Sequence, residues 1–328
     1  MQLRSNSYGC PYLFLAPMEG VGDQAFRKAI SFIGGMDEAV TEFLSVPANA
    51  HVQSLAKAYD ATELTPLPLA AQIMGADPHL MASMAIELEK RGAPRIDINC
   101  GCPSNTVTGR GAGSSLLKTP DFLYEVAKAV VLAVHIPVSL KMRSGYEDTA
   151  LFQENLLAAQ ASGVAFITLH PRTKAEGYTP PARWELIALA KQILKTTPLV
   201  GNGDILTVQD ALRMLSHTKC DALMIGRGAV INPFLFEQIK AHFEKIPSSA
   251  TPQKLEEYLR RFLLFSQQKN LSAKHLINKL KQLFSFLFRA TPCLLVHKNQ
   301  VLTSQTKDPF LFLEETLPFL TKNKNLFS

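Results

Sequence analysis

The chain has 328 residues, of which 47% are hydrophobic and 19% are charged, and its formal net charge is +6. This composition excludes a disordered or fibrous chain and predicts a packed globular protein with one large and one smaller domain. The chain has no run of 18 apolar residues and no apolar segment like that of a signal peptide near its N-terminus, so we predict no membrane association. Five scattered cysteines favour reduced thiols in the cytoplasm over a disulfide framework.

Eight short apolar runs typical of β-strands alternate with helical segments along the chain. Residues 79–92 and 120–135 carry helix signals, since the first segment ends at a glycine and the second opens with Pro-Asp. A repeat of about 25–35 residues is typical of β-α units that build a parallel sheet buried on both faces. Eight units predict a closed (β/α)8 barrel, the TIM-barrel class of α/β fold. The eight runs are residues 12–16, 38–43, 68–74, 95–99, 137–142, 165–170, 198–202 and 221–226.

The pattern changes after about residue 240 to apolar residues at helical spacing with basic residues between them. Residues 251–328 contain 12 Lys and Arg against 5 Asp and Glu, a net charge of +7, whereas the first 250 residues carry −1. This charge fits either a solvated helical face or a surface for a polyanion such as nucleic acid. We therefore predict a catalytic barrel over residues 1–244 and a small helical domain over residues 245–328. The expected helical segments are 254–270, 271–290 and 309–320.

Polar residues recur at the ends of the predicted strands, where (β/α)8 barrels carry their reactive groups. The last two strands end in the glycine motifs "GNGD" (201–204) and "GRG" (226–228). Glycine lets backbone N–H groups approach an anion, and Arg227 adds a charged donor, so these motifs predict a phosphorylated cofactor. The other strand-end residues are Glu19, Glu42, Gln72, Asn99, Lys141, Arg143, His170 and Arg172.

Lys141 ends an apolar strand and has two possible roles. It is either a Schiff-base nucleophile or a cation that stabilises an anionic cofactor ring. Gln72 is a candidate hydrogen-bond partner for the same ring. His170 is a candidate contact for a cofactor phosphate or a substrate, and a structural histidine is the alternative.

The segment "NCGCPSNTVTGRGAG" (99–113) places two cysteines and three glycines directly after a predicted strand. A tetrahedral metal site would need a second Cys or His pair nearby, and this part of the sequence has none, so we predict no metal. A disulfide between residues separated by one is strained, which argues against a redox pair. A single reactive thiol, Cys102, on a glycine-rich mobile loop fits better, with Cys100 as a small buried filler.

Six motifs occur in order over about residues 13–230: "APMEGVGD", "NCGCPSNTVTGRGAGSSLLK", "SLKMRSGY", "HPRTKAEGY", "GNGDI" and "MIGRGA". Together they resemble the tRNA-dihydrouridine synthases, flavoenzymes that reduce uridine in tRNA. The basic helices after residue 240 are similar to the C-terminal tRNA-binding domain of that family. The resemblance implies FMN at the barrel mouth, reduced by NADPH or NADH. The residues expected to contact FMN are Pro17, Met18, Glu19, Gln72, Lys141, His170, Asn202, Gly203, Asp204, Gly226 and Arg227.

The resemblance also implies a mechanism, in which hydride passes from flavin N5 to uracil C6 while Cys102 protonates C5 as general acid. Hydride addition builds enolate charge that an acid on the opposite face of the ring must quench. A thiol suits this role if it stays protonated until it is needed, unlike cysteines activated as thiolates. Asn99 is expected beside the uracil, and Arg143 and Arg172 are expected to point toward the RNA. Charge reversal at Lys274, Lys279 and Lys281 is expected to weaken tRNA binding.

The "PMEG" and "NCGC" variants are most similar to the bacterial subgroup that modifies uridine 16 in the tRNA D-loop. Two positions depart from the family pattern, Pro171 where glycine is usual and Asp204 where that subgroup often has glutamate. We predict a monomer, because no helix shows a sustained heptad seam. The alternatives are an FMN barrel that reduces a small pyrimidine or enoate, and an RNA-binding barrel without catalysis. The first gives no role to the basic C-terminal region, and the second is expected to lose Cys102 or Lys141.

Overall fold

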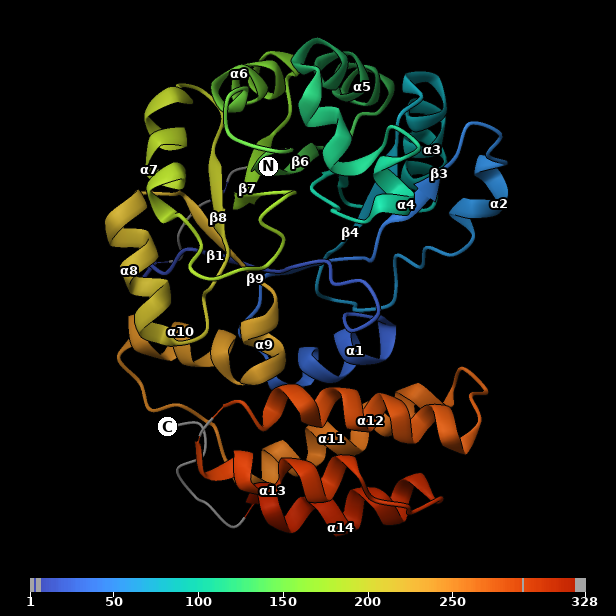
Figure 1. The fold of residues 1–328 in the computed structure, drawn as a ribbon, viewed down its shortest axis with the longest axis vertical. Coiled ribbons are helices and arrows are strands. Elements are labelled where there is room, and N and C mark those ends of the chain that lie inside the picture. Colours follow the sequence, from blue (N-terminus) through green and yellow to red (C-terminus); the bar gives the residue numbers. More distant parts are fainter. Residues whose placement is uncertain (1–2, 4–6, 291, 322–328) are drawn as a thin grey trace.

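A computed structural model describes residue 3 and residues 7–290 and 292–321 of the chain. In this part of the chain, eight parallel strands run in the order β2-β1-β9-β8-β7-β6-β5-β4, and a pairing between β2 and β4 closes the ring. This closure confirms the predicted (β/α)8 barrel (Figure 1). The barrel strands are β1 (Tyr12–Leu15), β2 (Glu38–Val40), β4 (Leu69–Gly75), β5 (Ile96–Cys100), β6 (Val138–Gly145), β7 (Phe166–Thr173), β8 (Leu199–Asn202) and β9 (Ala222–Ile225).

The second predicted strand, residues 38–43, is shorter than expected and is followed by a separate strand. β2 ends at Val40, and β3 (Leu44–Val46) pairs with the far end of β4. The interruption falls at Thr41, whose side-chain Oγ1 accepts the backbone N–H of Gln72 at 3.0 Å. A side-chain oxygen thus takes a ladder position that a backbone carbonyl would fill in a continuous strand.

Helices surround the barrel, and most follow a strand as the repeat predicted (Figure 1). The predicted helices at 79–92 and 120–135 are confirmed as α3 and α5. Two short elements, α4 and η1, lie in the glycine-rich segment after β5. The elements around the barrel are α1 (Gln24–Ile33), α2 (Val52–Ala56), α3 (Pro78–Lys90), α4 (Asn105–Thr108), η1 (Gly113–Lys118), α5 (Pro120–Ala133), α6 (Phe152–Ser162), α7 (Trp184–Ile193), α8 (Val208–Thr218), α9 (Arg227–Ile231) and α10 (Leu235–Glu244).

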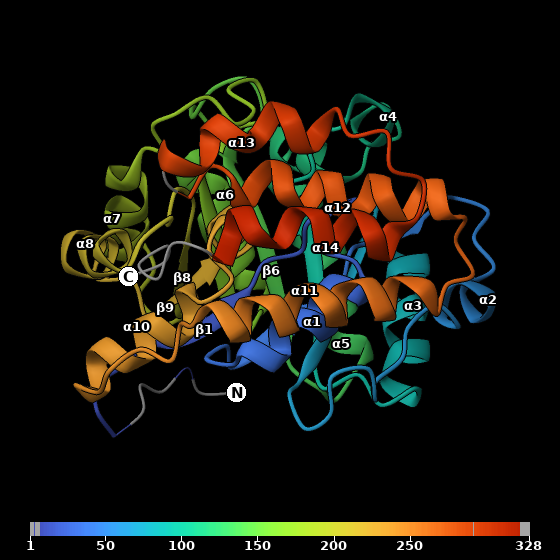
Figure 2. The same cartoon turned by 90° about the horizontal axis from the view of Figure 1, so that it is seen from below.

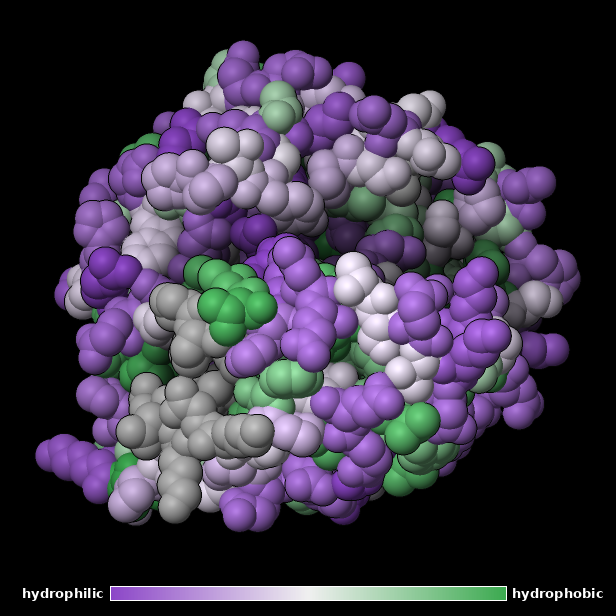
Figure 3. Space-filling view, turned by 60° about the horizontal axis from the view of Figure 1, so that its bottom comes forward, coloured by the Kyte–Doolittle hydropathy of each residue, from purple (hydrophilic) through white to green (hydrophobic). Residues whose placement is uncertain are grey.

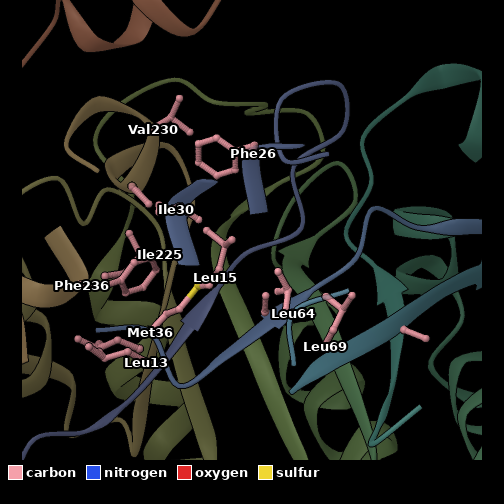
Figure 4. Close-up of a cluster of buried hydrophobic side chains, with 14 of the residues drawn as sticks. Leu13, Leu15, Phe26, Ile30, Met36, Leu64, Leu69, Ile225, Val230 and Phe236 are labelled. Carbon is pink, nitrogen blue, oxygen red and sulfur yellow. The ribbon is translucent and has the colours of Figure 1, made fainter. Parts of the chain in front are cut away.

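Apolar side chains form two separate cores, as expected for strands that are buried on both faces. The inner cluster fills the barrel and includes Phe14 and Phe166. The outer cluster lies between strands and helices, and Figure 4 shows Phe26 and Ile30 of α1 beside Leu15 of β1 within it. Alternate residues of one strand therefore serve different cores, and polar side chains on the inner face must find partners inside the barrel.

Four further helices pack below the barrel, side by side in the view of Figure 2. They are α11 (Pro252–Gln267), α12 (Ala273–Leu287), α13 (Pro292–Leu302) and α14 (Pro309–Thr321). α11 packs on α1, and α12 packs on α9. The three predicted C-terminal helices are confirmed, whereas α13 was not predicted. Within the described residues, no helix is both long and apolar enough to cross a membrane.

Candidate active site

A cavity of about 450 Å³ opens where the barrel strands end, and Figure 3 shows a hollow between the barrel rim and the C-terminal helices. Most of the predicted site residues line this cavity, although they come from all eight barrel strands or the segments after them. This convergence follows from a parallel barrel, in which all strand C-termini meet on one face. The predicted residues in the lining are Pro17, Met18, Glu19, Glu42, Gln72, Asn99, Cys102, Lys141, Arg143, His170, Asn202, Gly203, Asp204, Gly226 and Arg227.

Lys141 projects from β6 toward the floor of this cavity and is fixed by Asn202 of β8. Its Nζ donates to Asn202 Oδ1 at 3.2 Å, and Asn202 Nδ2 donates to the backbone oxygen of Met224 at 2.7 Å. Burial, together with the nearby Arg143 guanidinium, lowers the pKa of Lys141 to about 8. The amine is therefore a cation at neutral pH that titrates at mildly alkaline pH.

His170 is almost completely buried and is neutral. Burial and the surrounding cations, Lys141 first among them, lower the pKa of His170 to about 2. Its Nε2 lies 3.2 Å from a guanidinium nitrogen of Arg172. Because a guanidinium has only donors, Nε2 accepts this hydrogen bond, and the imidazole proton is on Nδ1. His170 therefore offers one neutral N–H donor.

Cys102 lies on the segment after β5 and is half-buried, whereas Cys100 is buried in the outer core. The Asn99 side chain holds this segment, since its Oδ1 accepts the backbone N–H groups of Gly101 and Cys102, both at 2.9 Å. Burial raises the pKa of the Cys102 thiol, and the carboxylate of Glu19 acts in the same direction. The thiol is thus protonated at neutral pH, which suits an acid better than a nucleophile.

Asp204 bridges two arginines at the glycine-rich edge of the cavity. Its Oδ2 lies 2.5 Å from Arg172 and its Oδ1 lies 3.1 Å from Arg227. Arg227 is partly exposed and lines the cavity, whereas Arg172 is buried and also donates to the backbone oxygen of Thr179 at 2.7 Å. The prediction that Arg172 points toward RNA is therefore wrong, because its guanidinium is turned inward by Asp204.

Arg143 lines the cavity, but its hydrogen bonds hold the surrounding loops. It donates to the backbone oxygens of Gly101, Thr173 and Gly177 at 2.7–2.8 Å. The ring of Tyr178, which is 57% exposed, lies near both Arg143 and Arg227, with centroid distances of 5.2 Å and 5.1 Å to the two guanidinium carbons. Sequence reasoning missed Tyr178 as a site residue, although it is the tyrosine of the quoted "HPRTKAEGY" motif.

The C-terminal helices contribute to the cavity through Phe286 and Arg289, two residues that sequence reasoning also missed. The Arg289 guanidinium lies 5.1 Å from the centroid of the Phe286 ring. Of the three lysines chosen for RNA binding, Lys274 is exposed. Lys279 instead pairs with Asp23, and Lys281 donates to the backbone oxygen of Ser304 at 2.8 Å. The amines of Lys279 and Lys281 are thus bonded within the protein, which corrects the expectation that these two lysines are available to RNA.

A profile described as dihydrouridine synthase (Dus) matches residues 14–310, almost the whole chain. The chain belongs to the dihydrouridine synthase family. It is 36% identical over 279 residues to a protein of Neisseria meningitidis serogroup B named "tRNA-dihydrouridine(16) synthase", covering 82% of this chain and 84% of that one. A protein of the same name from Shewanella oneidensis is 35% identical, over 85% of this chain and 90% of that one.

More distant solved structures share the fold of this dihydrouridine synthase. Histamine dehydrogenase from Rhizobium sp. 4-9 superposes with a TM-score of 0.53 at 13% identity, covering 76% of this chain and 49% of that one. A 2-naphthoyl-CoA reductase superposes with a TM-score of 0.54 at 12% identity, covering 72% of this chain and 50% of that one. These likenesses support the barrel architecture alone.

Family membership makes this dihydrouridine synthase an oxidoreductase, as the resemblance predicted. Members of the family generally use FMN and NAD(P)H. Cys102 belongs to the most distinctive motif behind the resemblance, and the structure places it at the cavity among the predicted cofactor residues.

Proposed function

We propose that this protein uses FMN and NADPH to reduce the 5,6 double bond of uridine 16 in tRNA. The observation that carries the proposal is the shared cavity, in which a protonated, half-buried Cys102 thiol faces the same space as Lys141 and the glycine-rich edge. The choice of position 16 rests on the names of the Neisseria and Shewanella relatives. The "PMEG" and "NCGC" variants support the same choice.

The donors around the cavity fit FMN. Gly203 has a φ of +120°, and a Cβ there would approach the His170 ring to 3.0 Å, so only glycine leaves this edge open. Arg227 stands beside it with a charge suited to a phosphate. Lys141 provides a cation for the ring, which favours this role over that of a Schiff-base nucleophile because Asn202 holds the amine. When bound and reduced by NAD(P)H, FMN supplies the hydride.

The remaining proton transfer falls to this chain's own residues. Cys102 is the proposed general acid that protonates C5 of uracil, and its raised pKa keeps the thiol protonated until charge develops on the base. Asn99 accepts the N–H, and Arg143 donates to the carbonyl oxygen, of the peptide bond that joins Gly101 to Cys102, so both hold the backbone that leads into this thiol. Asn99 also lines the cavity, so its amide is available to contact a carbonyl oxygen of the uracil.

We further propose that the segment from residue 245 onward is the tRNA-binding domain and that residues 1–244 form the catalytic domain. Exposed Lys274 and Arg289 are the proposed phosphate contacts, since charges already paired inside the protein contribute less to counterion release. The Phe286 ring beside Arg289 is suited to stacking on an unpaired base. A base must leave the stack of folded RNA to enter the cavity, and we propose that the Phe286 ring stabilises the base in this unstacked state. A monomer in the cytoplasm remains our prediction.

The decisive experiment is mass spectrometry of tRNA from cells with and without this gene, with dihydrouridine mapped by position. Loss of dihydrouridine at position 16 alone is the expected result, and a catalytically inactive Cys102→Ala copy should fail to restore it. Loss at another position would overturn the assignment of uridine 16. If dihydrouridine in tRNA is unchanged when the gene is removed, while the purified protein still binds FMN and oxidises NADPH, reduction of a small molecule is favoured instead.

A further inference from the structure

Strand β5 and the residue before it carry a row of buried polar side chains beneath the cavity. Ile96 and Ile98 belong to the outer core, so the alternating residues Arg95, Asp97 and Asn99 face the barrel interior. These three side chains are 1%, 0% and 8% exposed. Asn99 lines the cavity, but Arg95 and Asp97 lie below it and have no role in the chemistry proposed above.

The lower part of this row is an ion cluster with fixed geometry. Arg95 lies 2.6 Å from Glu38 of β2 and 3.3 Å from Oδ1 of Asp97. Its guanidinium packs over the Phe166 ring at 4.8 Å from the centroid. Ser139 of β6 bonds both Arg95 and the same Asp97 oxygen. Asp97 Oδ1 is thus held by the cluster, and its Oδ2 is left for the layer above.

That second oxygen begins a chain of hydrogen bonds with a single possible direction. Gln72 Nε2 donates to Asp97 Oδ2 at 2.7 Å, which turns Gln72 Oε1 toward Asn99, where it accepts Nδ2 at 2.8 Å. Asn99 Oδ1 must then face the backbone N–H groups that it accepts from Gly101 and Cys102. A carboxylate only accepts, so Asp97 determines the orientation of both amides.

We propose that Asp97 is a positioning residue for Cys102, acting through Gln72 and Asn99 to fix the backbone that presents the thiol. The same order leaves one further N–H on each amide, because an NH2 group has two hydrogens, and both residues line the cavity. The two amides therefore present donors, which match carbonyl oxygens of a uracil or a flavin ring. This inference rests on the proposed function for the role of Cys102, but the arrangement itself is testable without tRNA.

The test is the rate at which iodoacetamide alkylates Cys102 in the purified, flavin-loaded protein, with the modified cysteine identified by peptide mass spectrometry. Asp97→Asn keeps a single acceptor oxygen, which pairs with the Arg95 guanidinium. Its new NH2 group then faces Gln72, so the acceptor that orders the chain is lost while the side-chain volume is nearly preserved. We expect alkylation of Cys102 to accelerate on the order of tenfold, the effect of losing about one hydrogen bond that holds the segment. Flavin occupancy of each sample is measured by absorbance, so that samples of equal occupancy are compared.

A charge relocation supplies the rescue. In Asp97→Asn combined with Gln72→Glu, the carboxylate at position 72 accepts from the amide at position 97 and from Asn99 Nδ2, so Asn99 again faces its oxygen toward Cys102. We expect the double variant to return toward the wild-type alkylation rate. Gln72→Glu alone should instead accelerate alkylation, because it places two carboxylates next to each other. Glu38→Gln is the matched control, because Glu38 bonds Arg95 and Tyr12 but not Gln72. It should lower stability and leave the alkylation rate unchanged.

Two results would overturn the proposal: an unchanged rate in Asp97→Asn, or a double variant that reacts as fast as the faster single variant. If Asp97→Asn does not fold, Gln72→Met tests the same chain, because it removes the central amide and leaves the ion cluster intact. Faster alkylation is expected there too, and an unchanged rate again counts against the proposal. Since none of these readouts requires uridine reduction, they stand even if the proposed substrate is wrong.

Discussion

Asp23 uses its two carboxylate oxygens for two different parts of the protein. Oδ1 accepts the backbone N–H of Phe26 and caps α1, while Oδ2 pairs with Lys279 of α12 at 2.5 Å. Burial raises the pKa of Asp23, but Lys279, the Phe26 amide and the nearby Lys269 together outweigh burial, and the net effect is a lowered pKa. One side chain thus joins the start of a barrel helix to the C-terminal helices.

Lys279→Met is expected to lower the free energy of unfolding by about 1 kcal/mol, since it removes the nearer of two lysine partners of a largely buried carboxylate and leaves Lys269 at 3.5 Å from the same oxygen. A depressed carboxylate pKa contributes stability above its ordinary value and loses it as the pH falls through the folded value, so the difference from wild type should shrink in acid. Urea titrations at pH 7 and at pH 3 measure both effects. Lys274→Met, on an exposed lysine of the same helix, should leave both curves unchanged.

Charge reversal at Lys274 or at Arg289 should weaken tRNA binding and reduce the salt dependence of the affinity by about one unit of log–log slope. Each variant removes a proposed phosphate contact, and fewer counterions should then be released on binding. Filter binding of unmodified tRNA at several salt concentrations gives the slope. Glu125 is an exposed residue on the far side of the barrel. Glu125→Lys therefore tests for a nonspecific effect of net charge and should leave the salt dependence of tRNA affinity unchanged.

Cys102→Ala should keep its bound flavin and its reduction by NADPH but lose uridine reduction on the order of 10²–10⁴-fold, the usual contribution of a general acid. Single-turnover assays with reduced enzyme and tRNA separate the two steps. Cys100→Ala is the matched control two residues away, since its thiol is buried in the outer core. It should lower stability slightly and retain turnover, and a large loss there would question the choice between the cysteines.

FMN binding is expected to weaken as the pH rises through about 8, where Lys141 loses its charge in the empty cavity. The sign follows because deprotonation removes the cation that we propose interacts with the FMN ring. Fluorescence titrations between pH 7 and 9.5 avoid the phosphate titration near pH 6. In Lys141→Gln the affinity should be lower and independent of pH across this range. A wild-type affinity without pH dependence would contradict the role given to the amine.

The two arginines of Asp204 should behave differently when replaced. Arg172→Met leaves a carboxylate without its buried partner and should lower the free energy of unfolding by about 3 kcal/mol. Arg227→Met affects a partly exposed pair and should change stability by less than about 1 kcal/mol. It should nevertheless weaken FMN binding, because Arg227 lines the cavity. Thermal unfolding and FMN titration of both variants check this contrast.

The barrel strands and most of the cavity were predictable because they depend on local pattern. Each strand is an apolar run with turn residues after it, and a parallel barrel brings every strand end to one face. Lys141 and His170 could therefore be assigned to one site from their position after a strand. The short strand β3 could not, since Thr41 replaces a backbone partner only once β4 lies beside it.

The errors concern side chains whose direction is set by a distant residue. Arg172 and Lys279 follow the same spacing as residues that face the cavity or solvent, but Asp204 and Asp23 draw them inward. Phe286 and Arg289 lie in a segment that is read as an ordinary amphipathic helix, and they reach the cavity through the packing of α12 on α9. Helix α13 lacks a clear apolar face in its sequence, so its existence depends on neighbouring helices.

The contribution of α12 to the cavity wall has a consequence for how such enzymes diversify. A helical segment exchanged between relatives would carry part of the reaction chamber with it, through Phe286 and Arg289. Because the same segment is the proposed tRNA-binding domain, a chimera with a foreign C-terminal segment should change target choice and turnover at once.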